Sequence, residues 1–202
     1  MVDKSLWTQQ IERDPQHSHR YIQRFKDLAA AGNDLHGEAR LIDAMVGREA
    51  RILDAGCGPG RVGGELARRG HTVVGVDVDP VLIAEAATQF PESTWRVVDL
   101  AELDLPAAGI AEPFDVIVAA GNVMAFLAPS TRRDVLANLA AHLAADGRLV
   151  VGFGAGRGYE VADFLADAAA AGLSIDLELG TWDLRPRTAG SDFLVAVLSR
   201  RP

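Results

Sequence analysis

The chain has 202 residues, a formal net charge of −8, 49% hydrophobic residues and a single cysteine. This length suits one α/β domain, and no Pro/Ser-rich linker divides residues 1–202, so we expect a single domain. The apolar content excludes disorder over most of the length, and arginines scattered through an acidic chain offer no basic stripe to nucleic acid. The polar start, the lack of a long apolar run and the lone cysteine predict a soluble cytoplasmic protein without a membrane partner.

The N-terminal segment, residues 1–47, is expected to be helical and to precede the core. Residues 1–15 show little periodicity, so we expect a loosely ordered lead-in anchored by Trp7. Apolar residues at helical spacing predict two helices, over 18–31 and 37–46, each followed by a glycine that ends it.

From residue 51 to 202 the chain alternates strands and helices and closes with two strands that no helix separates. The alternation predicts an α/β fold with a doubly wound, mostly parallel seven-stranded sheet, and the last two strands predict an antiparallel hairpin. Expected strands cover 51–55, 72–78, 94–100, 114–121, 149–153, 173–184 and 193–198, and expected helices cover 61–69, 80–90, 129–146 and 159–171.

A glycine-rich turn follows the first expected strand, in the stretch Arg51-Ile-Leu-Asp-Ala-Gly-Cys-Gly-Pro-Gly60. Glycines lack a Cβ, so the backbone of the turn can lie close against a ligand, and the following helix points unpaired N–H groups at it. Asp54 ends the strand, and its carboxylate would repel a pyrophosphate but attract an ammonium or hydroxyl group. The turn therefore predicts a nucleoside site without a phosphate chain.

Three carboxylates end neighbouring strands and are expected to face one crevice, because ligands bind at the carboxyl ends of the strands in such a sheet. They are Asp54, Asp77 and Asp99. Asp77 lies 21 residues beyond Gly56, the offset at which an acid accepts hydrogen bonds from both ribose hydroxyls. Asp99 can accept from an exocyclic amino group such as that of adenine. Together they indicate an adenosine with a positively charged extension.

This constellation resembles the class I S-adenosylmethionine-dependent methyltransferases of the small-molecule type, which have a Rossmann-like fold. The matching motifs are Leu53-Asp-Ala-Gly-Cys-Gly-Pro-Gly60, Val76-Asp-Val-Asp-Pro80, Asp99-Leu100, Phe114-Asp-Val-Ile-Val118 and Gly147-Arg-Leu-Val150. The resemblance implies that S-adenosylmethionine is the cofactor and residues 1–47 a lid. It places Gly56 and Gly58 under the methionine part, Asp77 at the ribose, Asp99 and Leu100 at the adenine, and the Ala119 carbonyl at the cofactor's amino group. Asp54, Cys57 and Val78 are expected among the other cofactor-binding residues. It also implies that Asp79 caps the next helix.

Two alternatives stay open. Gly58-x-Gly60-x-x-Gly63 fits a dinucleotide pattern, but Lys4 and Lys26 are the only lysines, so the Tyr-x-x-x-Lys pair of short-chain dehydrogenases is absent. A non-catalytic protein that binds the cofactor remains compatible, because methyl transfer needs mainly alignment and often no dedicated catalytic residue. Five histidines without spaced cysteine or acidic partners predict no metal site, and Cys57 is expected to fill space rather than to act as a nucleophile.

The acceptor is expected to be small, because the chain has no long insertion, and to meet residues outside the cofactor core. Tyr21 is one candidate, although core packing explains it as well. Asn122, after the fourth strand, either orients an acceptor or forms a turn, and Trp182, in the hairpin, either recognises an acceptor or covers the sheet edge. Arg40 or Arg61 is expected to pair with the methionine carboxylate.

Overall fold

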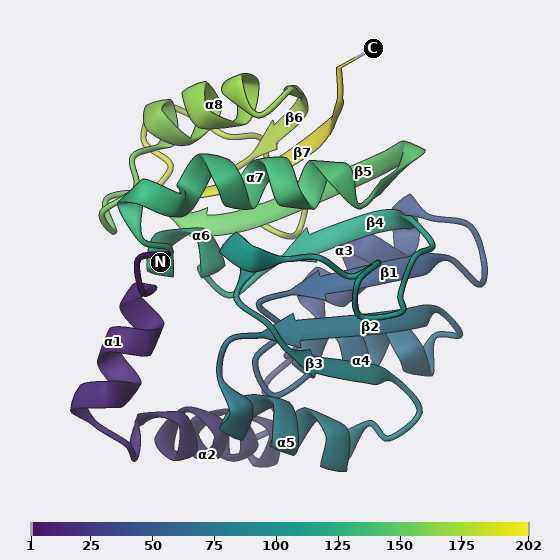
Figure 1. Cartoon of the computed structure of the whole chain (residues 1–202), viewed down its shortest axis with the longest axis vertical. Coiled ribbons are helices and arrows are strands. Elements are labelled where there is room, and N and C mark those ends of the chain that lie inside the picture. The colour runs from purple at the N-terminus through teal and green to yellow at the C-terminus, as the bar shows by residue number, and fades with distance from the viewer. Residues whose placement is uncertain (1, 202) are drawn as a thin grey trace.

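The computed structural model describes residues 2–201, which form one seven-stranded sheet in the order β3-β2-β1-β4-β5-β7-β6 (Figure 1). Strands β1 to β5 pair in parallel, and β7 runs antiparallel to both of its neighbours. The prediction of a mostly parallel, doubly wound sheet with one reversed strand is therefore confirmed. The strands are β1 Arg51–Ala55, β2 Thr72–Asp77, β3 Thr94–Val97, β4 Phe114–Ala119, β5 Leu143–Gly154, β6 Leu173–Leu179 and β7 Phe193–Arg200.

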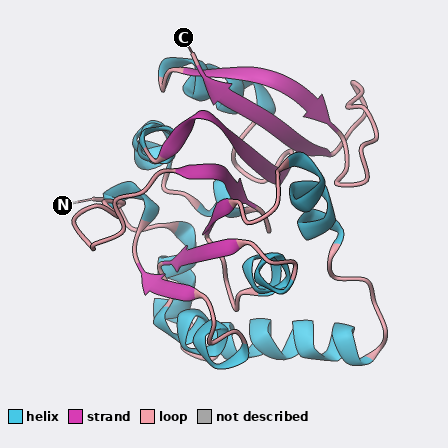
Figure 2. Ribbon diagram, turned by 90° about the vertical axis from the view of Figure 1, so that its right-hand side faces the viewer, coloured by secondary structure: helices cyan, strands magenta, loops and turns pink. Residues whose placement is uncertain are grey.

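Helices cover both faces of this sheet (Figure 2). Their apolar stripes pack on strands whose buried runs have no solvent face, as parallel sheets require. One layer contains α3 Gly37–Met45, α4 Arg61–Arg68 and α5 Pro80–Gln89, and the other contains α6 Val123–Phe126, α7 Arg132–Ala141 and α8 Val161–Ala170. Among residues 2–201, no helix is both long and apolar enough to cross a membrane.

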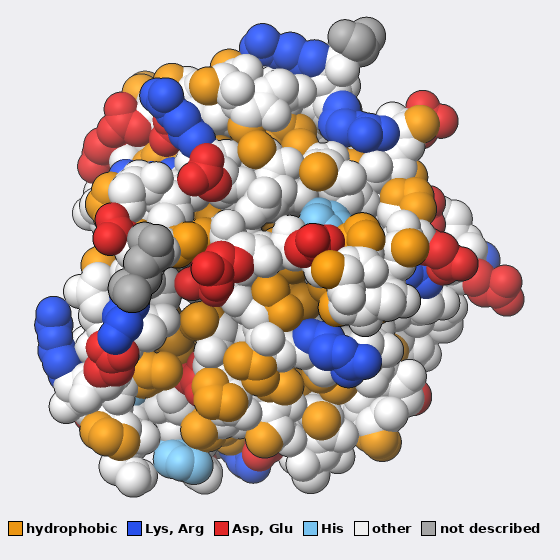
Figure 3. Space-filling model, viewed as in Figure 1, with side chains coloured by type: hydrophobic (Ala, Val, Ile, Leu, Met, Phe, Trp, Pro, Cys, Tyr) orange, Lys and Arg blue, Asp and Glu red, His pale blue; other side chains and the backbone are white. Residues whose placement is uncertain are grey.

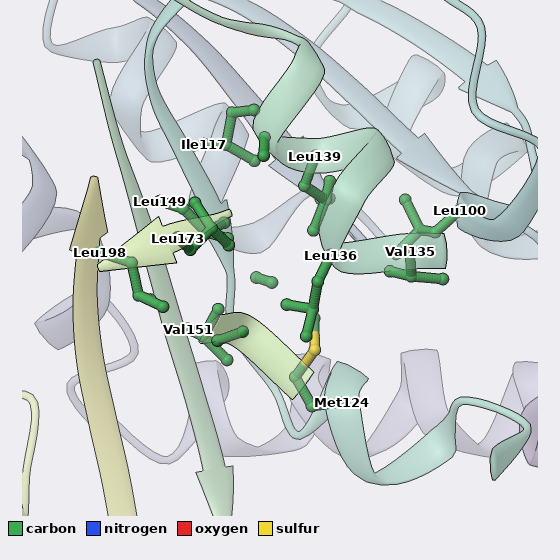
Figure 4. Packing of buried hydrophobic residues seen from close by; sticks show 14 of the residues in the cluster. Leu100, Ile117, Met124, Val135, Leu136, Leu139, Leu149, Val151, Leu173 and Leu198 are labelled. Atoms are coloured by element: carbon green, nitrogen blue, oxygen red, sulfur yellow. The ribbon is translucent and has the colours of Figure 1, made fainter. Parts of the chain in front are cut away.

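The largest hydrophobic cluster lies between the sheet and α7 and α8 (Figure 4). Leu136 and Leu139 stand three residues apart on α7, so both face the sheet, where they meet Ile117 and Leu149 from neighbouring strands. All four side chains are fully buried. This packing fixes β4 and β5 against α7, and it thereby fixes the loops that leave the carboxyl ends of these strands.

The N-terminal lead-in is helical, and the prediction of a loosely ordered segment was wrong. Helix α1, Leu6–Arg13, begins after Ser5, whose hydroxyl accepts a hydrogen bond from the N–H of Thr8 at 3.0 Å. Helix α2, His17–Ala30, follows and packs beside α5. Figure 1 shows α1 at the edge where the parallel strands end, so the N-terminal helices lie where the ligand was expected.

Helix α7 was expected to continue to Asp146-Gly147, but it ends at Ala141 and β5 begins at Leu143. Gly147 instead lies inside β5, where the pairing with β4 shifts register. A Cβ at Gly147 would lie 2.7 Å from the carbonyl oxygen of Phe114, so glycine is required for this close approach of two backbones. Asp146-Gly147 therefore marks an irregularity in β5 and does not end a helix.

Two expected strands end three or more residues earlier than predicted. Strand β3 ends at Val97, because Asp99 caps the 3-10 helix η1, Leu100–Glu102. Strand β6 ends at Leu179, and the chain then forms a loop before β7. The short helix α6 was not expected, and the helix expected from residue 129 begins as the 3-10 turn η2, Pro129–Thr131, before α7.

Candidate functional site

The glycine turn after β1 is held to β2 by backbone hydrogen bonds. The N–H groups of Gly56 and Cys57 both donate to the carbonyl of Val76, at 2.8 and 3.0 Å. Gly56 and Gly58 have φ of +75° and +55°, which glycine adopts without strain. A Cβ at Gly56 would lie 2.4 Å from a methyl group of Val123. The turn therefore needs glycine both for its backbone conformation and for its contact with α6.

Asp54 lies beneath this turn and is only 2% exposed. Its Oδ2 accepts a hydrogen bond of 2.7 Å from the N–H of Gly63, in the first turn of α4. Burial raises the pKa of Asp54 to about 7, because the charged carboxylate is withdrawn from water. The carboxyl group thus ties the start of α4 to the end of β1.

Asp77 ends β2 and accepts hydrogen bonds on both carboxylate oxygens, from the N–H of Gly58 and from the N–H of Asp79, each at 2.9 Å. Burial raises its pKa to about 6. Each oxygen has a second lone pair, so Asp77 can still accept hydrogen bonds from a ligand.

Asp99 begins η1, with Oδ1 accepting from the N–H of Ala101 at 2.9 Å. The carbonyl of the next residue, Leu100, accepts a hydrogen bond of 3.1 Å from the side-chain amide of Asn138. The peptide group that joins Leu100 to Ala101 is therefore held from both sides, by the carboxylate of Asp99 and by α7.

Two adjoining cavities lie over the carboxyl ends of β1, β2 and β4. The larger contains about 630 Å³ of space free of protein atoms, including the part open to solvent, and Asp77, Val78, Asp99 and Leu100 line it. On the face in Figure 3, hydrophobic side chains gather beside α1, at this edge of the sheet.

The smaller cavity contains about 370 Å³ of such space and is lined by Asp54, Cys57 and Arg61, among others. Cys57 is buried against Phe90 and Trp95 in a small apolar cluster. Burial raises the pKa of its thiol, so the group stays protonated at neutral pH. Cys57 therefore fills space beneath the turn, as the sequence predicted.

The two cavities meet at Tyr21, Gly56, Gly58 and Gly121, which line both. A Cβ at Gly58 would lie 3.7 Å from the ring of Tyr21, and one at Gly121 would lie 3.9 Å from its hydroxyl oxygen. Side chains at these two glycines would therefore narrow the passage between the cavities. Burial raises the pKa of Tyr21, so its hydroxyl is neutral.

Three predicted site residues do not line either cavity. Asn122 holds the turn after β4, because its Oδ1 accepts a 2.7 Å hydrogen bond from the N–H of Gly154 and its own φ is +67°. Trp182 lies over Gly152, where a Cβ would be 2.2 Å from its ring. Ala119 is fully buried and paired with β5. The residues after it, Ala120 and Gly121, line the cavities instead.

The two candidate arginines differ in position. Arg61 lines the smaller cavity, where its guanidinium makes two hydrogen bonds to Glu38, at 2.9 and 2.5 Å, and one to the carbonyl of Leu35. Arg40 pairs with Asp34 on the exposed surface. The geometry therefore favours Arg61 as the cation near a bound ligand.

Comparison with known proteins identifies the family. A family model described as a methyltransferase domain matches residues 52–147. A TehB-like SAM-dependent methyltransferase from Corynebacterium glutamicum, known from a crystal structure, is 53% identical, with a TM-score of 0.88 over 93% of this chain and 100% of that chain. This chain belongs to the S-adenosylmethionine-dependent methyltransferases. Its cofactor is S-adenosylmethionine, which removes the nicotinamide-dependent alternative.

Other relatives of this methyltransferase are less similar in sequence. The magnesium-protoporphyrin O-methyltransferase of Rhodobacter capsulatus is 39% identical over 100 residues, which are 47% of this chain and 41% of that protein. The chain spans about two-fifths of the length of the curated relatives that it first matches. Magnesium protoporphyrin IX methyltransferase from Synechocystis PCC 6803, with bound SAM, is 21% identical with a TM-score of 0.62, over 94% of this chain and 83% of that chain, and shows the shared fold.

The residues of this methyltransferase suit its cofactor. Asp77 and Asp99 supply acceptors for hydroxyl and amino donors in the larger cavity, and Arg61 supplies a cation in the smaller one. The passage beside Gly58 and Gly121 joins the larger cavity to the smaller one. A ligand with an adenosine end and an amino-acid end needs such a connection.

Sequence reasoning missed part of the methyltransferase's cavity wall. Ser5 and Trp7 line the larger cavity from the N-terminal segment, and Phe126 lines it from α6. The one available signal was Ser5, two residues before Trp7, because serine often caps the start of a helix. Asp79 caps α5, as predicted, but its further contacts with the N-terminal segment were not foreseen.

Proposed function

We propose that this methyltransferase transfers the methyl group of S-adenosylmethionine to a small-molecule acceptor. The observation that carries the proposal is the covered site. The N-terminal helices place Trp7 and Tyr21 in the cavity wall opposite the glycine turn, so the acceptor has to enter beneath them. A polymer substrate would need an open surface at the same edge of the sheet. We further propose that residues 1–202 act as one domain with residues 1–47 as its lid.

In this proposal the cofactor spans both cavities and supplies an electrophilic methyl group on its sulfonium. Asp77 and Val78 hold the ribose, and Asp99 and Leu100 hold the adenine. The methionine part lies over Gly56, Cys57 and Gly58, with Arg61 rather than Arg40 near its carboxylate. Asp54 supports this wall from below through its hydrogen bond to Gly63. Ala120 and Gly121 take the place at the end of β4 that was expected for Ala119.

We propose that the acceptor approaches at Tyr21 and Gly121, where the two cavities meet. The chain contributes alignment and exclusion of water there, because the neutral Tyr21 hydroxyl can donate or accept one hydrogen bond and Trp7 and Phe126 make the nearby wall apolar. Asn122 and Trp182 act from outside the wall, by holding the ends of β4 and β5 in place.

The proposal is tested by incubating the protein with a metabolite extract and S-adenosylmethionine carrying a labelled methyl group. We expect label in a low-molecular-weight product, and an Asp77→Ala protein in the same extract gives the background. Label confined to macromolecules would overturn the small-molecule acceptor. Binding of S-adenosylhomocysteine without any labelled product would instead indicate a non-catalytic cofactor-binding protein.

A further inference from the structure

Asp79 carries more contacts than a helix cap requires. It is fully buried at the start of α5, where Oδ1 accepts hydrogen bonds from the N–H groups of Val81 and Leu82, at 2.9 and 3.4 Å. Its other oxygen, Oδ2, accepts from the indole Nε1 of Trp7 at 2.9 Å and from the hydroxyl of Ser18 at 2.5 Å. Oδ1 therefore accepts hydrogen bonds from the core, and Oδ2 accepts them from the N-terminal helices.

Both donors belong to the segment that covers the cofactor cavity. Trp7 lines the larger cavity itself. Ser18 is buried on α2, one helical turn before Tyr21, which lines both cavities. A change in the position of Trp7 or of α2 relative to Asp79 would therefore move the cavity wall.

The N–H of Asp79 donates to Oδ1 of Asp77 at 2.9 Å, so the attachment point of the N-terminal helices is bonded directly to the proposed ribose acceptor. These helices also contact the core through Lys26, which pairs with Glu85 of α5 at 2.7 Å, and through Trp7 and Ile22, which form a small buried cluster with Leu82 of α5. Asp79 is thus a buried polar attachment of these helices.

We infer that Asp79 is a positioning residue for the cofactor: its buried carboxylate latches α1 and α2 over the cofactor cavity, and release of this latch admits and frees the cofactor. The inference rests on the proposed position of the cofactor in these cavities. The two latch donors, Trp7 and Ser18, lie 72 and 61 residues from Asp79 in the sequence. Their bonds can be broken without loss of the cap on α5, because that cap uses the other oxygen.

The test measures dissociation of S-adenosylhomocysteine from the full chain by rapid displacement. Trp7→Phe removes the indole N–H but keeps an aromatic ring, and Ser18→Ala removes the hydroxyl. We expect each to raise the dissociation rate about tenfold, equivalent to about 1.4 kcal/mol, and the double variant to raise it further. Ser199→Ala is a matched control, because it removes a hydroxyl bond to Asp176 outside the cover. This control should leave the rate within twofold.

Hydrogen exchange over residues 6–30 supplies a second readout, which does not depend on the dissociation rate. We expect bound S-adenosylhomocysteine to slow exchange there more than in α7, and the latch variants to lose this protection. A dissociation rate unchanged in both latch variants, with only a lower Tm, would make Asp79 purely structural and overturn the inference. Asp77→Ala separates the two proposals. If it leaves equilibrium binding intact, the position of the cofactor is wrong. If it weakens binding while the latch variants do not change the rate, only the latch is wrong.

Discussion

The glycine turn after β1 and the N-terminal helices form opposite walls of the same cavities, but different contacts hold them. Backbone hydrogen bonds to β2 fix the turn, and the turn continues into α4, which packs on the sheet. The N-terminal helices depend on side chains that converge on Asp79 and on a small apolar cluster. One wall is therefore part of the sheet, whereas the other is attached to it.

This difference predicts where substitutions act. Changes in the turn disturb backbone geometry, so they should lower stability and equilibrium affinity together. Changes at the latch should alter mainly the rates at which the cofactor enters and leaves, because the sheet does not depend on them. The glycine turn and the acids Asp54 and Asp77 that support it are called the fixed wall, and the N-terminal helices the attached wall. The predictions below concern the fixed wall, from the largest expected effect to the smallest.

Gly56→Ala should have the largest effect. The new Cβ would meet Val123 at 2.4 Å and would be forced to a φ of +75°. Left-handed backbone costs about 1–2 kcal/mol and overpacking about 1–3 kcal/mol, so unfolding free energy should fall by about 2–5 kcal/mol. Urea unfolding and calorimetry with S-adenosylhomocysteine measure both consequences. Gly70→Ala is the control, since Gly70 has a φ of +92° with open space around it and should show the strain alone. Equal losses in both variants would mean that the contact with Val123 is unimportant.

Asp77→Ala should weaken binding of S-adenosylhomocysteine by about 1.5–3 kcal/mol, or roughly ten- to hundredfold, because hydrogen bonds to a charged acceptor are lost. Asp115→Ala is a matched control, because Asp115 also accepts a backbone hydrogen bond, from the N–H of Arg51, outside the two cavities. Calorimetry at pH 8 compares them. If both variants bind the ligand as the parent does, Asp77 does not hold the ribose.

Asp54→Asn should change the pH dependence of stability. Burial raises the folded-state pKa of Asp54 to about 7, above an ordinary value of about 3.9, so between these values the folded protein holds a proton that the unfolded chain has released. Its contribution to the free energy of unfolding is full below about pH 4 and falls by up to about 1.4 kcal/mol per pH unit as the pH rises to 7. Asparagine can still accept from Gly63 but lacks this proton. Urea unfolding from pH 4.5 to 8 should show that the free energy of unfolding of the variant rises relative to that of the parent as the pH rises. A difference that stays constant with pH would contradict the raised pKa of Asp54.

The fixed wall was largely predictable from the sequence, because its determinants are local. A short apolar strand, a glycine turn and an acid at the end of each of three strands lie within residues 51–100, and the sheet rule places them at one edge. The structure brings Asp77 and Asp99 to the larger cavity and Asp54 to the smaller one beside it, whereas a single crevice was expected. The offset by one residue at Ala119 reflects only where β4 stops pairing with β5.

The attached wall was not predictable in the same way. Helix α1 is only eight residues long, and it is stabilised by contacts that Trp7 makes with distant residues. The bonds from Trp7 and Ser18 to Asp79 join positions more than 60 residues apart, and no spacing rule encodes them. The position of Trp182 was not predictable for the same reason, because this loop residue packs on Gly152 of β5, which is distant in the sequence.

The reversed strand β7 has a practical consequence for how the protein can be handled. Because β7 runs against β5, its last residue, Arg200, pairs with Leu173 at the sheet edge opposite the cavities. Figure 1 shows the chain leaving there, whereas the N-terminal end stands beside α1. A fusion partner or a surface attachment joined after β7 should therefore leave the entry of the cofactor unobstructed. One joined before α1 would be attached to the helices whose release from Asp79 is inferred to admit the cofactor.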